Sequence, residues 1–576
     1  MLEKIILRNK KSDSWRIFSS PEDVLFTHDI SRVRALLADV EGQVEKNNLF
    51  AVGYLSYEAA PAFDSSYVVQ NNSILPLMCF GLFADYEEYD LIKTNGNNFA
   101  ALSNWELGVS ADVYKENFLH IKEQIALGNT YQINYTIRNH TKKLMDPYKF
   151  FIERAMHAPY AAYIEDQDHT IISASPELFF SLDGETLISR PMKGTSRRGK
   201  TLVEDNILRN QLKDSEKNIA ENIMITDMLR NDMGRISESG SINVSSLCDV
   251  EKYPTVWQMT STIESKTSAS IVEIFKALFP CASVTGAPKI SSMEIISKIE
   301  DKPREIYTGA IGIIEPNRQA YFSVPIRTII SDNKTKGATY GTGGGIVWDS
   351  DYQAELQECI TKSAVLTTTN INNDFELFET MLWLPEKGIL LEDYHLDRIS
   401  NSAAYFGFSF DKTNTRSQLD KYTEELRGKS KIIRLFLNQN AGINISQEDF
   451  INTEKEYTVS LAKNPIDSED VFLYHKTTKR DVYESAFGKE STSNDVLLWN
   501  SKGNITETTI ANVIIMIDNE FVTPPIKSGL LGGTYRAMLL EKGKIKERVI
   551  HKSELATLKE ITLINSVRGK FQAQLI

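Results

Sequence analysis

Lys193 is the first side chain in the sequence whose type and position could do chemistry. It stands in the stretch ISRPMKGTSRRG, between a proline and a glycine and just after an expected strand, where the backbone can fix its direction. A lysine that is withdrawn from water loses its proton and becomes a nucleophile. A surface lysine in a turn has the same local sequence, so Lys193 indicates covalent chemistry only together with other residues.

Three carboxylates on two expected helices form a second candidate group. Glu221 lies in a helix expected over residues 214–229, and Glu355 and Glu358 lie in a helix expected over 351–366. Their spacing of three places Glu355 and Glu358 on one helical face. Together the three could hold Mg²⁺, which prefers oxygen ligands. Taken singly, they are typical of solvated glutamates on a helix surface.

Two glycine-rich stretches and one arginine could bind a carboxylate. The stretches FPCASVTGAPK (279–289) and GTGGGIV (341–347) are expected loops whose backbone N–H groups can bind anions, although each alone is also typical of a tight turn. Neither matches a phosphate-binding or dinucleotide-binding loop. Arg327, in FSVPIRT, is expected on a strand between them, where its guanidinium could hold a carboxylate through two hydrogen bonds.

Residues 375–576 carry a different set of reactive side chains. HLDR places His395 and Arg398 three apart on one helix, and YHKTTKR contains Lys476. NITETTIAN contains Glu507, and TPPIKSGLLGGTYR is a glycine-rich turn. Each has an ordinary interpretation: a capped helix, a basic turn, an edge glutamate and a loop.

The elements that must position these side chains fall into two domains. A chain of 576 residues is too long for one ordinary core. The polar stretch 367–374 follows an expected helix and precedes the strand-like run FELFETMLWL, which predicts domains over 1–368 and 372–576. Strands and helices mix without regular alternation, so the expected fold class is α+β.

Three local patterns predict individual elements. Tyr114, Phe118, Ile121 and Ile125 recur at helical spacing and end at Gly128. The stretch 170–191 predicts strands around an Asp183–Gly184 turn. The stretches LLWNSKGNITET and VIIMIDNEFVTPP predict two further hairpins.

Composition excludes several classes of protein. The net charge of −13 argues against nucleic acid as a partner. The four cysteines lack CxxC spacing, which suits a reducing cytosol better than a disulfide framework or a zinc site. The sequence shows neither the apolar core of a signal peptide nor a run long enough to cross a membrane, so we expect a soluble cytoplasmic protein without a membrane partner.

The first set of residues is part of a longer series of motifs that resembles the chorismate-utilising enzymes, a family that includes anthranilate, aminodeoxychorismate, isochorismate and salicylate synthases. The match runs from about residue 50 to about 366, and its collinear motifs are QINYT (132–136), SPELFF (175–180), PMKGT (191–195), AENIMITDMLRND (220–232), TGAPK (285–289), YTGAIG (307–312), IRT (326–328) and GGGIV (343–347). The resemblance implies a large two-sheet α/β sandwich around a Mg²⁺–chorismate site.

The family resemblance also assigns roles to residues of the first domain. Lysine at position 193 is similar to the aminodeoxychorismate synthase branch, whereas anthranilate synthases typically have alanine there. By implication Lys193 attacks the chorismate ring with loss of the 4-hydroxyl, and ammonia then displaces the lysine at the 4-position. The implied Mg²⁺ ligands are Glu221, Glu355 and Glu358. The implied substrate-binding residues are Thr285, Gly286, Tyr307, Arg327, Gly344 and Lys362.

Two positions depart from the family pattern. Asn218 stands where an acidic residue usually lies three before Glu221, which implies a metal shell with more water. Gln258 stands where many members have a histidine, and an amide does not titrate usefully.

The second set of residues resembles the fold-type IV pyridoxal-phosphate enzymes, which include branched-chain and D-amino-acid aminotransferases and aminodeoxychorismate lyase. The shared pattern is FET, HLDR, K-x-x-x-R, TE-x-x-x-N and the glycine turn. By implication Lys476 forms the Schiff base with the cofactor, and Glu507 binds the protonated pyridine nitrogen. Arg398, with Thr534 and Ser566, would hold the phosphate.

Together the two resemblances imply synthesis of 4-aminobenzoate from chorismate and ammonia, by amination and then elimination of pyruvate. No amidotransferase domain is recognisable, so a separate glutamine amidotransferase subunit is the expected source of ammonia. Fold-type IV enzymes are commonly dimeric, which points to a homodimer through the C-terminal domain. Two alternatives stay open: an anthranilate or salicylate synthase joined to an aminotransferase, and a non-catalytic regulatory homologue. The residues of the second domain do not separate lyase from aminotransferase.

Overall fold

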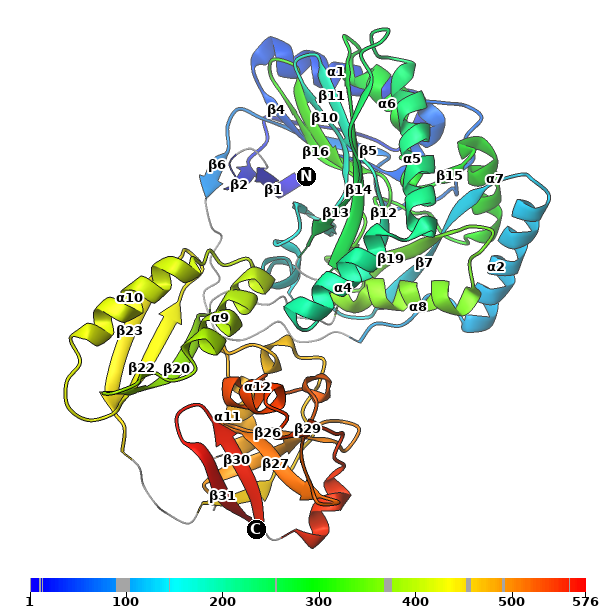
Figure 1. The fold of residues 1–576 in the computed structure, drawn as a ribbon. Coiled ribbons are helices and arrows are strands. Elements are labelled where there is room, and N and C mark those ends of the chain that lie inside the picture. The colour runs from blue at the N-terminus through cyan, green and yellow to red at the C-terminus, as the bar shows by residue number, and fades with distance from the viewer. Residues whose placement is uncertain are drawn as a thin grey trace. The chain divides into compact units, whose positions relative to one another are not determined.

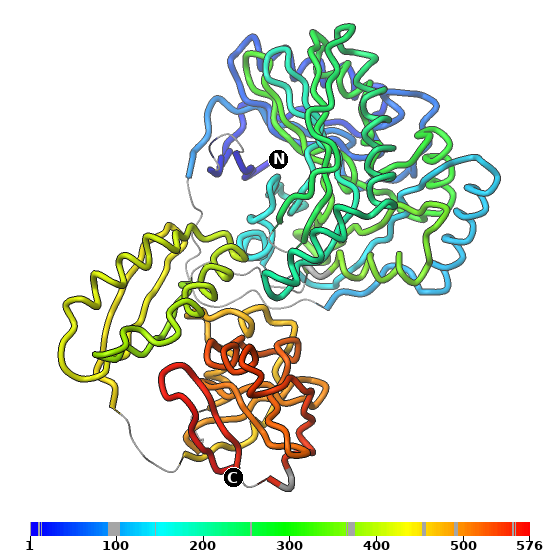
Figure 2. Tube along the Cα trace, in the orientation of Figure 1, coloured from blue at the N-terminus to red at the C-terminus, as the bar shows by residue number. Residues whose placement is uncertain are grey.

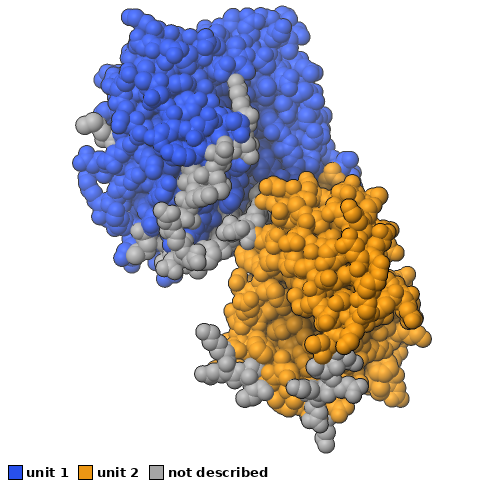
Figure 3. All heavy atoms as spheres, turned by 90° about the vertical axis from the view of Figure 1, so that its left-hand side faces the viewer, with its two compact units in different colours: residues 1–197, 211–370 blue, residues 198–210, 371–576 orange. Residues whose placement is uncertain are grey.

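The computed structural model describes residues 2–9, 12, 14–89, 104–144, 146–253, 256–366, 375–451, 457–488, 493–558 and 560–576. The expected domain junction, 367–374, lies outside them. Two compact units divide the chain: unit 1 comprises Met1–Arg197 and Gln211–Asn370, and unit 2 comprises Arg198–Asn210 and Ile371–Ile576 (Figure 3). The segment Arg198–Asn210, which the sequence analysis placed in the first domain, therefore clusters with the second.

The two sheets of unit 1 confirm the expected α+β sandwich. Within the described residues, the first sheet has the strand order β15 (Gly286–Ala287), β7 (Gln132–Thr141), β19 (Ala338–Ile346), β18 (Thr328–Asp332), β9 (His169–Ser175), β8 (Tyr160–Asp166), β1 (Leu2–Asn9), β2 (Ser14–Ser19), β6 (Glu87–Tyr89). The second has the order β12 (Met192–Arg197), β14 (Val256–Lys266), β11 (Thr186–Arg190), β10 (Leu178–Asp183), β17 (Gln319–Ser323), β16 (Ala310–Glu315), β4 (Phe50–Leu55), β5 (Met78–Phe83), β3 (Asp23–Thr27), with β13 (Asn243–Lys252) also paired to β14.

Helices cover the outer faces of the sandwich (Figure 1). An apolar cluster with Ile5, Val52 and Ile311 lies between the sheets. Helices α1 (Val33–Asn47), α5 (Glu216–Gly234) and α6 (Ile271–Leu278) share a core with the second sheet. Helices α2 (Ala111–Ala126), α7 (Lys289–Ile299) and α8 (Tyr352–Lys362) share one with β7 and β19 of the first sheet. A further helix of unit 1 is α3 (Pro147–Phe150), and most of α4 (Leu202–Lys213) belongs to the segment that clusters with unit 2.

The local predictions for unit 1 are largely confirmed. Tyr114, Phe118 and Ile121 are buried on α2, and Gly128 just beyond its end has a φ of +75°. Strands β10 and β11 form a hairpin whose turn contains Gly184, with a φ of +60°. Strands that are distant in sequence pair with one another, as β1 does with β8. Figure 2 traces the path of the chain between them.

Unit 2 contains two sheets and a covering layer of helices. Its small sheet has the order β21 (Gly388–Ile389), β20 (Leu377–Leu384), β22 (Lys431–Leu437), β23 (Ile443–Asp449), and it packs against α9 (Glu392–Phe406) and α10 (Lys412–Glu424). Among the described residues, the larger sheet has the order β26 (Ile505–Thr508), β25 (Asp495–Trp499), β24 (Thr458–Leu461), β31 (Gly569–Leu575), β30 (Glu560–Asn565), β27 (Asn512–Ile517), β28 (Glu520–Thr523), β29 (Lys546–Glu547).

Both hairpins expected in the second domain are present, as β25–β26 and β27–β28. Helices α11 (Asp481–Phe487) and α12 (Thr534–Glu541) pack against the larger sheet. None of the described helices is long and apolar enough to cross a membrane.

Candidate active sites

Lys193 follows strand β11, as expected, and is itself the second residue of strand β12. A glutamine holds the backbone on its C-terminal side. The side-chain N–H of Gln258, on β14, donates to the carbonyl of Gly194 at 2.9 Å, and its amide oxygen accepts from the Thr195 hydroxyl at 2.9 Å. Asn218 packs against the same glycine, because a Cβ at Gly194 would lie 3.0 Å from the Asn218 Cβ. Both departures from the family pattern therefore shape the strand that carries Lys193.

The amine of Lys193 lies among charged groups in a poorly hydrated site. Burial lowers the pKa of Lys193, against the raising influence of the carboxylates of Glu221, Glu177 and Glu358. Lys362 lowers this pKa further. A lysine with a lowered pKa carries more free base at neutral pH, which is the form that acts as a nucleophile.

A strand of glycines lies directly beside Lys193. The stretch GTGGGIV, expected as a loop, forms part of strand β19, so that expectation was wrong. A Cβ added at Gly345 would lie 2.9 Å from Nζ of Lys193, and one at Gly344 would lie 2.9 Å from Oε2 of Glu355. Glycine is needed at positions 344 and 345 because neighbouring side chains approach the strand closely, and not because the backbone turns there.

Gln132, at the start of β7, is a polar residue of this site that sequence analysis missed. Its amide nitrogen would lie 2.8 Å from a Cβ at Gly345, and thus close to the Lys193 amine. The residue is fully buried, and within the described part of the chain neither amide atom has a hydrogen-bond partner. Buried amides without partners are rare in folded proteins. The feature of the sequence that could have revealed it is a glutamine at the first position of the apolar strand QINYT.

Glu177 is a second missed residue, immediately before β10. Burial raises the pKa of Glu177 to about 7, although the Ser283 hydroxyl donates to it at 2.7 Å and Lys193 lowers it. A carboxyl group in this range can give or take a proton at neutral pH. Its signal was an acidic residue directly before the apolar run LFF.

The three expected Mg²⁺ ligands are individually paired and do not form a preformed cluster. Glu221 lies 3.9 Å from Lys217 on α5, and Glu358 lies 2.6 Å from Lys362 on α8. Glu355 accepts from the Ser350 hydroxyl at 2.7 Å. No group of three or more metal-ligating side chains is close enough to hold a metal anywhere in the described ranges. The carboxylates suit a hard cation, but their lysine partners would have to be displaced.

Arg327 lies at a bend in the chain, whereas Tyr307 is buried against strand β19. Arg327 lies at a bend just before β18, with a φ of +54°, and not on a strand as expected. Burial lowers its pKa, and its guanidinium has no hydrogen bond or ion pair within the described residues. Tyr307 is buried beneath Gly341, whose added Cβ would lie 2.3 Å from the tyrosine ring.

The remaining expected substrate-binding residues border the same strands. The Thr285 hydroxyl donates to the carbonyl of Cys281 at 2.8 Å, and Gly286 belongs to β15, the neighbour of β7. Lys362 donates to the carbonyl of Gly343 at 2.9 Å.

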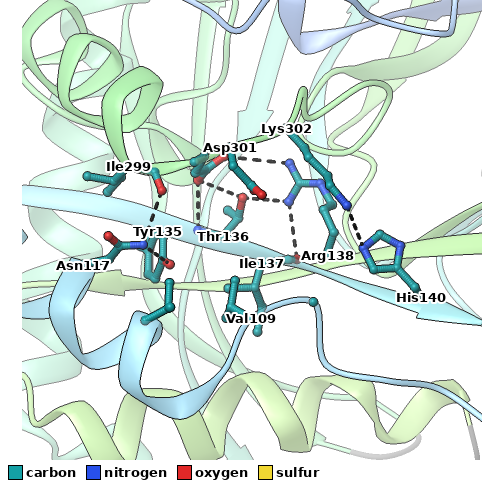
Figure 4. A pocket seen from close by; sticks show the side chains of 13 residues that line it. Val109, Asn117, Tyr135, Thr136, Ile137, Arg138, His140, Ile299, Asp301 and Lys302 are labelled. Atoms are coloured by element: carbon teal, nitrogen blue, oxygen red, sulfur yellow. Dashed lines mark hydrogen bonds and ion pairs between the residues drawn. The ribbon is translucent and has the colours of Figure 1, made fainter.

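A separate cavity of about 130 Å³ in unit 1 contains none of the expected site residues (Figure 4). Arg138 and Lys302 line it, together with Asp301, Asn117 and other residues of β7 and the end of α7. The Arg138 guanidinium donates to the Thr136 hydroxyl at 2.8 Å and lies 3.8 Å from Glu300. These contacts give its polar groups partners within the protein, which is typical of a structural network.

In unit 2, Lys476 resembles Lys193 in being a lysine whose pKa is lowered by burial. Burial lowers its pKa to about 7, and Arg398 lowers it further, whereas Glu379 and Glu507 raise it. Its carbonyl accepts from the Phe378 N–H at 3.1 Å, which ties the lysine to β20. Lys479, three residues further on, lies against the Phe472 ring at 4.7 Å.

Glu507 is a buried carboxyl group on β26 with several donors aimed at it. It accepts from the Tyr483 hydroxyl at 2.9 Å, the Leu531 N–H at 2.9 Å and the Asn512 amide at 3.1 Å. Burial raises its pKa to about 7 despite these hydrogen bonds. A bound cation would lower this pKa again, so the carboxylate fits a protonated ring nitrogen.

Glu379, in the FET motif, links His395 and Arg398 as expected for residues on one helix face. Its carboxylate lies 2.7 Å from Nδ1 of His395 and accepts from Arg398 at 2.8 and 2.5 Å. These neighbours lower its pKa to about 2 although the group is buried. Sequence analysis missed its role; the signal was a glutamate between Leu377 and Met381 on the buried face of β20.

The phosphate-binding residues expected in unit 2 are Arg398 on helix α9, Thr534 at the start of helix α12 and Ser566 between two strands. Another Arg398 nitrogen donates to the carbonyl of Gly532 at 3.3 Å, close to Thr534 at the start of α12. The Thr534 hydroxyl lies 3.4 Å from His395. Ser566 lies between β30 and β31 and donates to the carbonyl of Thr380 at 3.3 Å. A helix start of this kind suits an anion.

Comparison with known proteins identifies two families along the chain. Residues 92–368 match the family described as chorismate binding enzyme, and residues 376–576 match amino-transferase class IV. Aminodeoxychorismate synthase component 1 of Escherichia coli is 32% identical over 341 residues, which cover 54% of this chain and 75% of that protein. A probable chloroplastic aminodeoxychorismate synthase of rice is 38% identical, over 47% of this chain and only 32% of its own length.

A solved structure supports the fold of unit 1. Anthranilate synthase component I from Streptococcus pneumoniae superposes with a TM-score of 0.54 at 21% identity, covering 63% of this chain and 92% of that one. The chain therefore belongs to the chorismate-binding enzyme family, represented by aminodeoxychorismate synthase component 1, and continues into a class IV aminotransferase domain.

Proposed function

We propose that the chain makes 4-aminobenzoate in two steps: amination of chorismate to 4-amino-4-deoxychorismate in unit 1, and elimination of pyruvate in unit 2. The observation that carries the first step is a lysine of lowered pKa beside a carboxyl group whose pKa is raised to about 7. Relatives named aminodeoxychorismate synthase support the choice of branch.

In the first step, the Lys193 amine forms a bond to the ring while the 4-hydroxyl leaves as water with a proton from Glu177. Ammonia then forms a bond at ring carbon 4 as the bond to Lys193 breaks, and Glu177 recovers a proton from the new ammonium group. Dividing one substitution into two lowers the barrier of each. Gln132, unpaired beside the amine, would orient the incoming ammonia.

Charged groups around this centre would hold the substrate. Arg327, whose guanidinium has no hydrogen bond or ion pair among the described residues, could bind a carboxylate. Glu221, Glu355 and Glu358 would hold Mg²⁺ together with water and the substrate, once the lysine partners of Glu221 and Glu358 move aside. When bound, the metal would supply positive charge to neutralise a ring carboxylate.

In the second step, unit 2 would hold pyridoxal phosphate, which supplies an electron sink next to the carbon that loses a proton. Glu507 would bind the protonated ring nitrogen, and Arg398, Thr534 and Ser566 would hold the phosphate. Lys476 would take the proton from ring carbon 4 of the intermediate. The bond between the ring and the enolpyruvyl oxygen would then break, the ring would become aromatic, and the departing group would take up a proton to form pyruvate. An aminotransferase would use the same residues, and the adjoining synthase unit favours the lyase.

The test is to supply chorismate, ammonium, Mg²⁺ and pyridoxal phosphate to the full chain and separate the aromatic products. We expect 4-aminobenzoate and pyruvate. Lys476→Ala should accumulate 4-amino-4-deoxychorismate, Lys193→Ala should lose the first step, and the control Lys479→Ala should do neither. Anthranilate, salicylate or amino-group exchange alone would overturn the assignment of one unit.

Two further additions to the same assay test the ligands. Chelating the metal should stop amination and leave elimination from supplied intermediate unchanged. Glutamine alone should give no product, and a separate glutaminase subunit should restore it; activity with glutamine alone would refute the need for that partner.

A further inference from the structure

The segment Arg198–Asn210 belongs to unit 2 although it begins only five residues after Lys193 (Figure 3). It comprises the connection after β12 and most of helix α4. A segment that is far in sequence from the rest of its unit is retained there by specific contacts, and these contacts lie beside Lys476.

The segment has a rigid internal structure. The guanidinium of Arg198 donates to both oxygens of Asp205 at 2.8 and 2.7 Å, and both side chains are nearly buried. The Gly199 N–H donates to the same carboxylate at 2.8 Å. A Cβ at Gly199 would lie 2.2 Å from the backbone nitrogen of Asp205, so only glycine fits. The turn therefore holds its carbonyl groups in fixed directions.

Two of these carbonyl groups accept hydrogen bonds from aromatic side chains of unit 2. The Tyr405 hydroxyl donates to the carbonyl of Gly199 at 2.7 Å. Nε2 of His475 lies 3.0 Å from the carbonyl of Lys200. The Tyr405 and His475 rings stack with their centroids 4.5 Å apart. The segment and the aromatic pair thus form one continuous packed group.

One neutral tautomer of His475 satisfies both of its ring nitrogens. Burial lowers its pKa to about 4, so the ring is neutral at physiological pH. Because the Lys200 carbonyl can only accept, Nε2 carries the proton, and Nδ1, which lies 2.9 Å from the Ser402 hydroxyl, then accepts from that hydroxyl. His475 is therefore fixed at both nitrogens, and it directly precedes Lys476.

We propose that the segment Arg198–Asn210 is a positioning element of the second catalytic site: its Lys200 carbonyl holds His475 and thereby the backbone that presents Lys476. The other side of that backbone is held by the Phe378 N–H, which donates to the Lys476 carbonyl at 3.1 Å. His475 is thus a positioning residue for the lysine. The inference rests on the proposed function only in treating Lys476 as the catalytic lysine.

Hydrogen exchange in the full chain without cofactor tests the positioning directly. The Phe378 amide is the reporter, because its hydrogen bond ends on Lys476. Tyr405→Phe keeps the ring stacking and removes the hydrogen bond to Gly199, and we expect exchange at Phe378 to quicken about fivefold, as for loss of one ordinary hydrogen bond. Tyr321→Phe is the matched control, since that hydroxyl also donates to a backbone carbonyl, that of Arg8, at 2.8 Å, and does so in unit 1.

A second pair of variants separates the hydrogen bond from general packing. His475→Ala should quicken exchange at Phe378 more than Tyr405→Phe does, and His475→Gln, whose amide can still donate to the Lys200 carbonyl, should recover part of the protection. Unchanged exchange in both Tyr405→Phe and His475→Ala, or an equal effect of Tyr321→Phe, would overturn the proposal. Failure of the wild-type chain to capture pyridoxal phosphate at Lys476 would instead refute the function proposed for unit 2, and the exchange result would stand.

Discussion

Replacing Gly345 by alanine should disable amination while leaving the protein folded. The added Cβ would lie 2.9 Å from the Lys193 amine and 2.8 Å from the Gln132 amide nitrogen, whereas ordinary contacts begin at 3.4 Å. The amine and the amide must therefore each move by about half an ångström or more. Both atoms end flexible side chains, so the strand itself can remain in place.

The size of the effect follows from these displacements. A misplacement of about 1 Å in a reacting group can cost about 100-fold in rate. Overpacking in a core costs about 1–3 kcal/mol, and movable side chains place this substitution near the lower end. We therefore expect amination to fall between about 10-fold and 100-fold, with a loss of about 1 kcal/mol in the free energy of unfolding.

The assay measures the initial rate of 4-amino-4-deoxychorismate formation from chorismate and ammonium. Elimination from supplied intermediate should be unchanged, which shows that unit 2 is intact. Gly337→Ala, just before the same strand, is the control, because its nearest neighbour would lie at 3.4 Å. A folded Gly345→Ala chain that aminates within twofold of wild type would refute the placement of the reacting amine beside this strand.

Three other predictions follow from the two sites. The chain without cofactor should capture pyridoxal phosphate faster as the pH rises through about 7, and the rate of capture should level off above that pH. The reason is that the pKa of Lys476 is lowered to about 7 and only the free amine attacks an aldehyde. A rate of capture, followed by absorbance, that does not depend on pH would contradict this. Glu379→Gln should lower the free energy of unfolding by about 3 kcal/mol at pH 7, because it leaves Arg398 and His395 without their carboxylate. The pKa of Glu379 in the folded protein, about 2, lies below the ordinary 4.5, so the stability difference between wild type and variant should shrink as the pH falls from 4.5 towards 2. Denaturant titrations at acid pH measure this difference. Gln132→Met should keep or raise stability, because it removes an unpaired buried amide that costs about 1–3 kcal/mol, yet it should slow ammonia-dependent amination; thermal unfolding and product rates together decide it.

Sequence could predict residues whose role depends on type and local spacing. Helix α2 follows from the spacing of Tyr114, Phe118 and Ile121, and the β10–β11 turn follows from Gly184, because both are set by local geometry. Glu355 and Glu358 were correctly expected on one helix, since a spacing of three fixes the face. Whether those carboxylates gather around a metal depends on tertiary contacts, and the structure pairs Glu358 with Lys362 instead.

The residues that sequence reasoning missed act through contacts between distant strands. Gln132 matters because β7 pairs with β19 and faces the glycines that border Lys193. The run GTGGGIV was expected as a loop because glycine usually indicates turning, but here it gives room for Lys193 and the Glu355 carboxylate. Glu379 could have been found, because a strand period of two places it between two buried apolar residues. Assignment of residues 198–210 to unit 2 depends on contacts over more than 200 positions, which no local pattern encodes.

The two sites share a physical arrangement although their folds differ. Each pairs a lysine of lowered pKa with a buried carboxyl group whose pKa is raised to about 7, Glu177 in unit 1 and Glu507 in unit 2. In each, burial disfavours the charged form of both groups. In unit 1 the carboxyl group can then exchange a proton near neutral pH, whereas in unit 2 a bound protonated ring nitrogen would return Glu507 to its charged form. The strand that carries Lys193 continues into the turn that holds His475. A substitution at Gly199 or Asp205 should therefore impair elimination more than amination, even though both residues follow Lys193 closely in sequence.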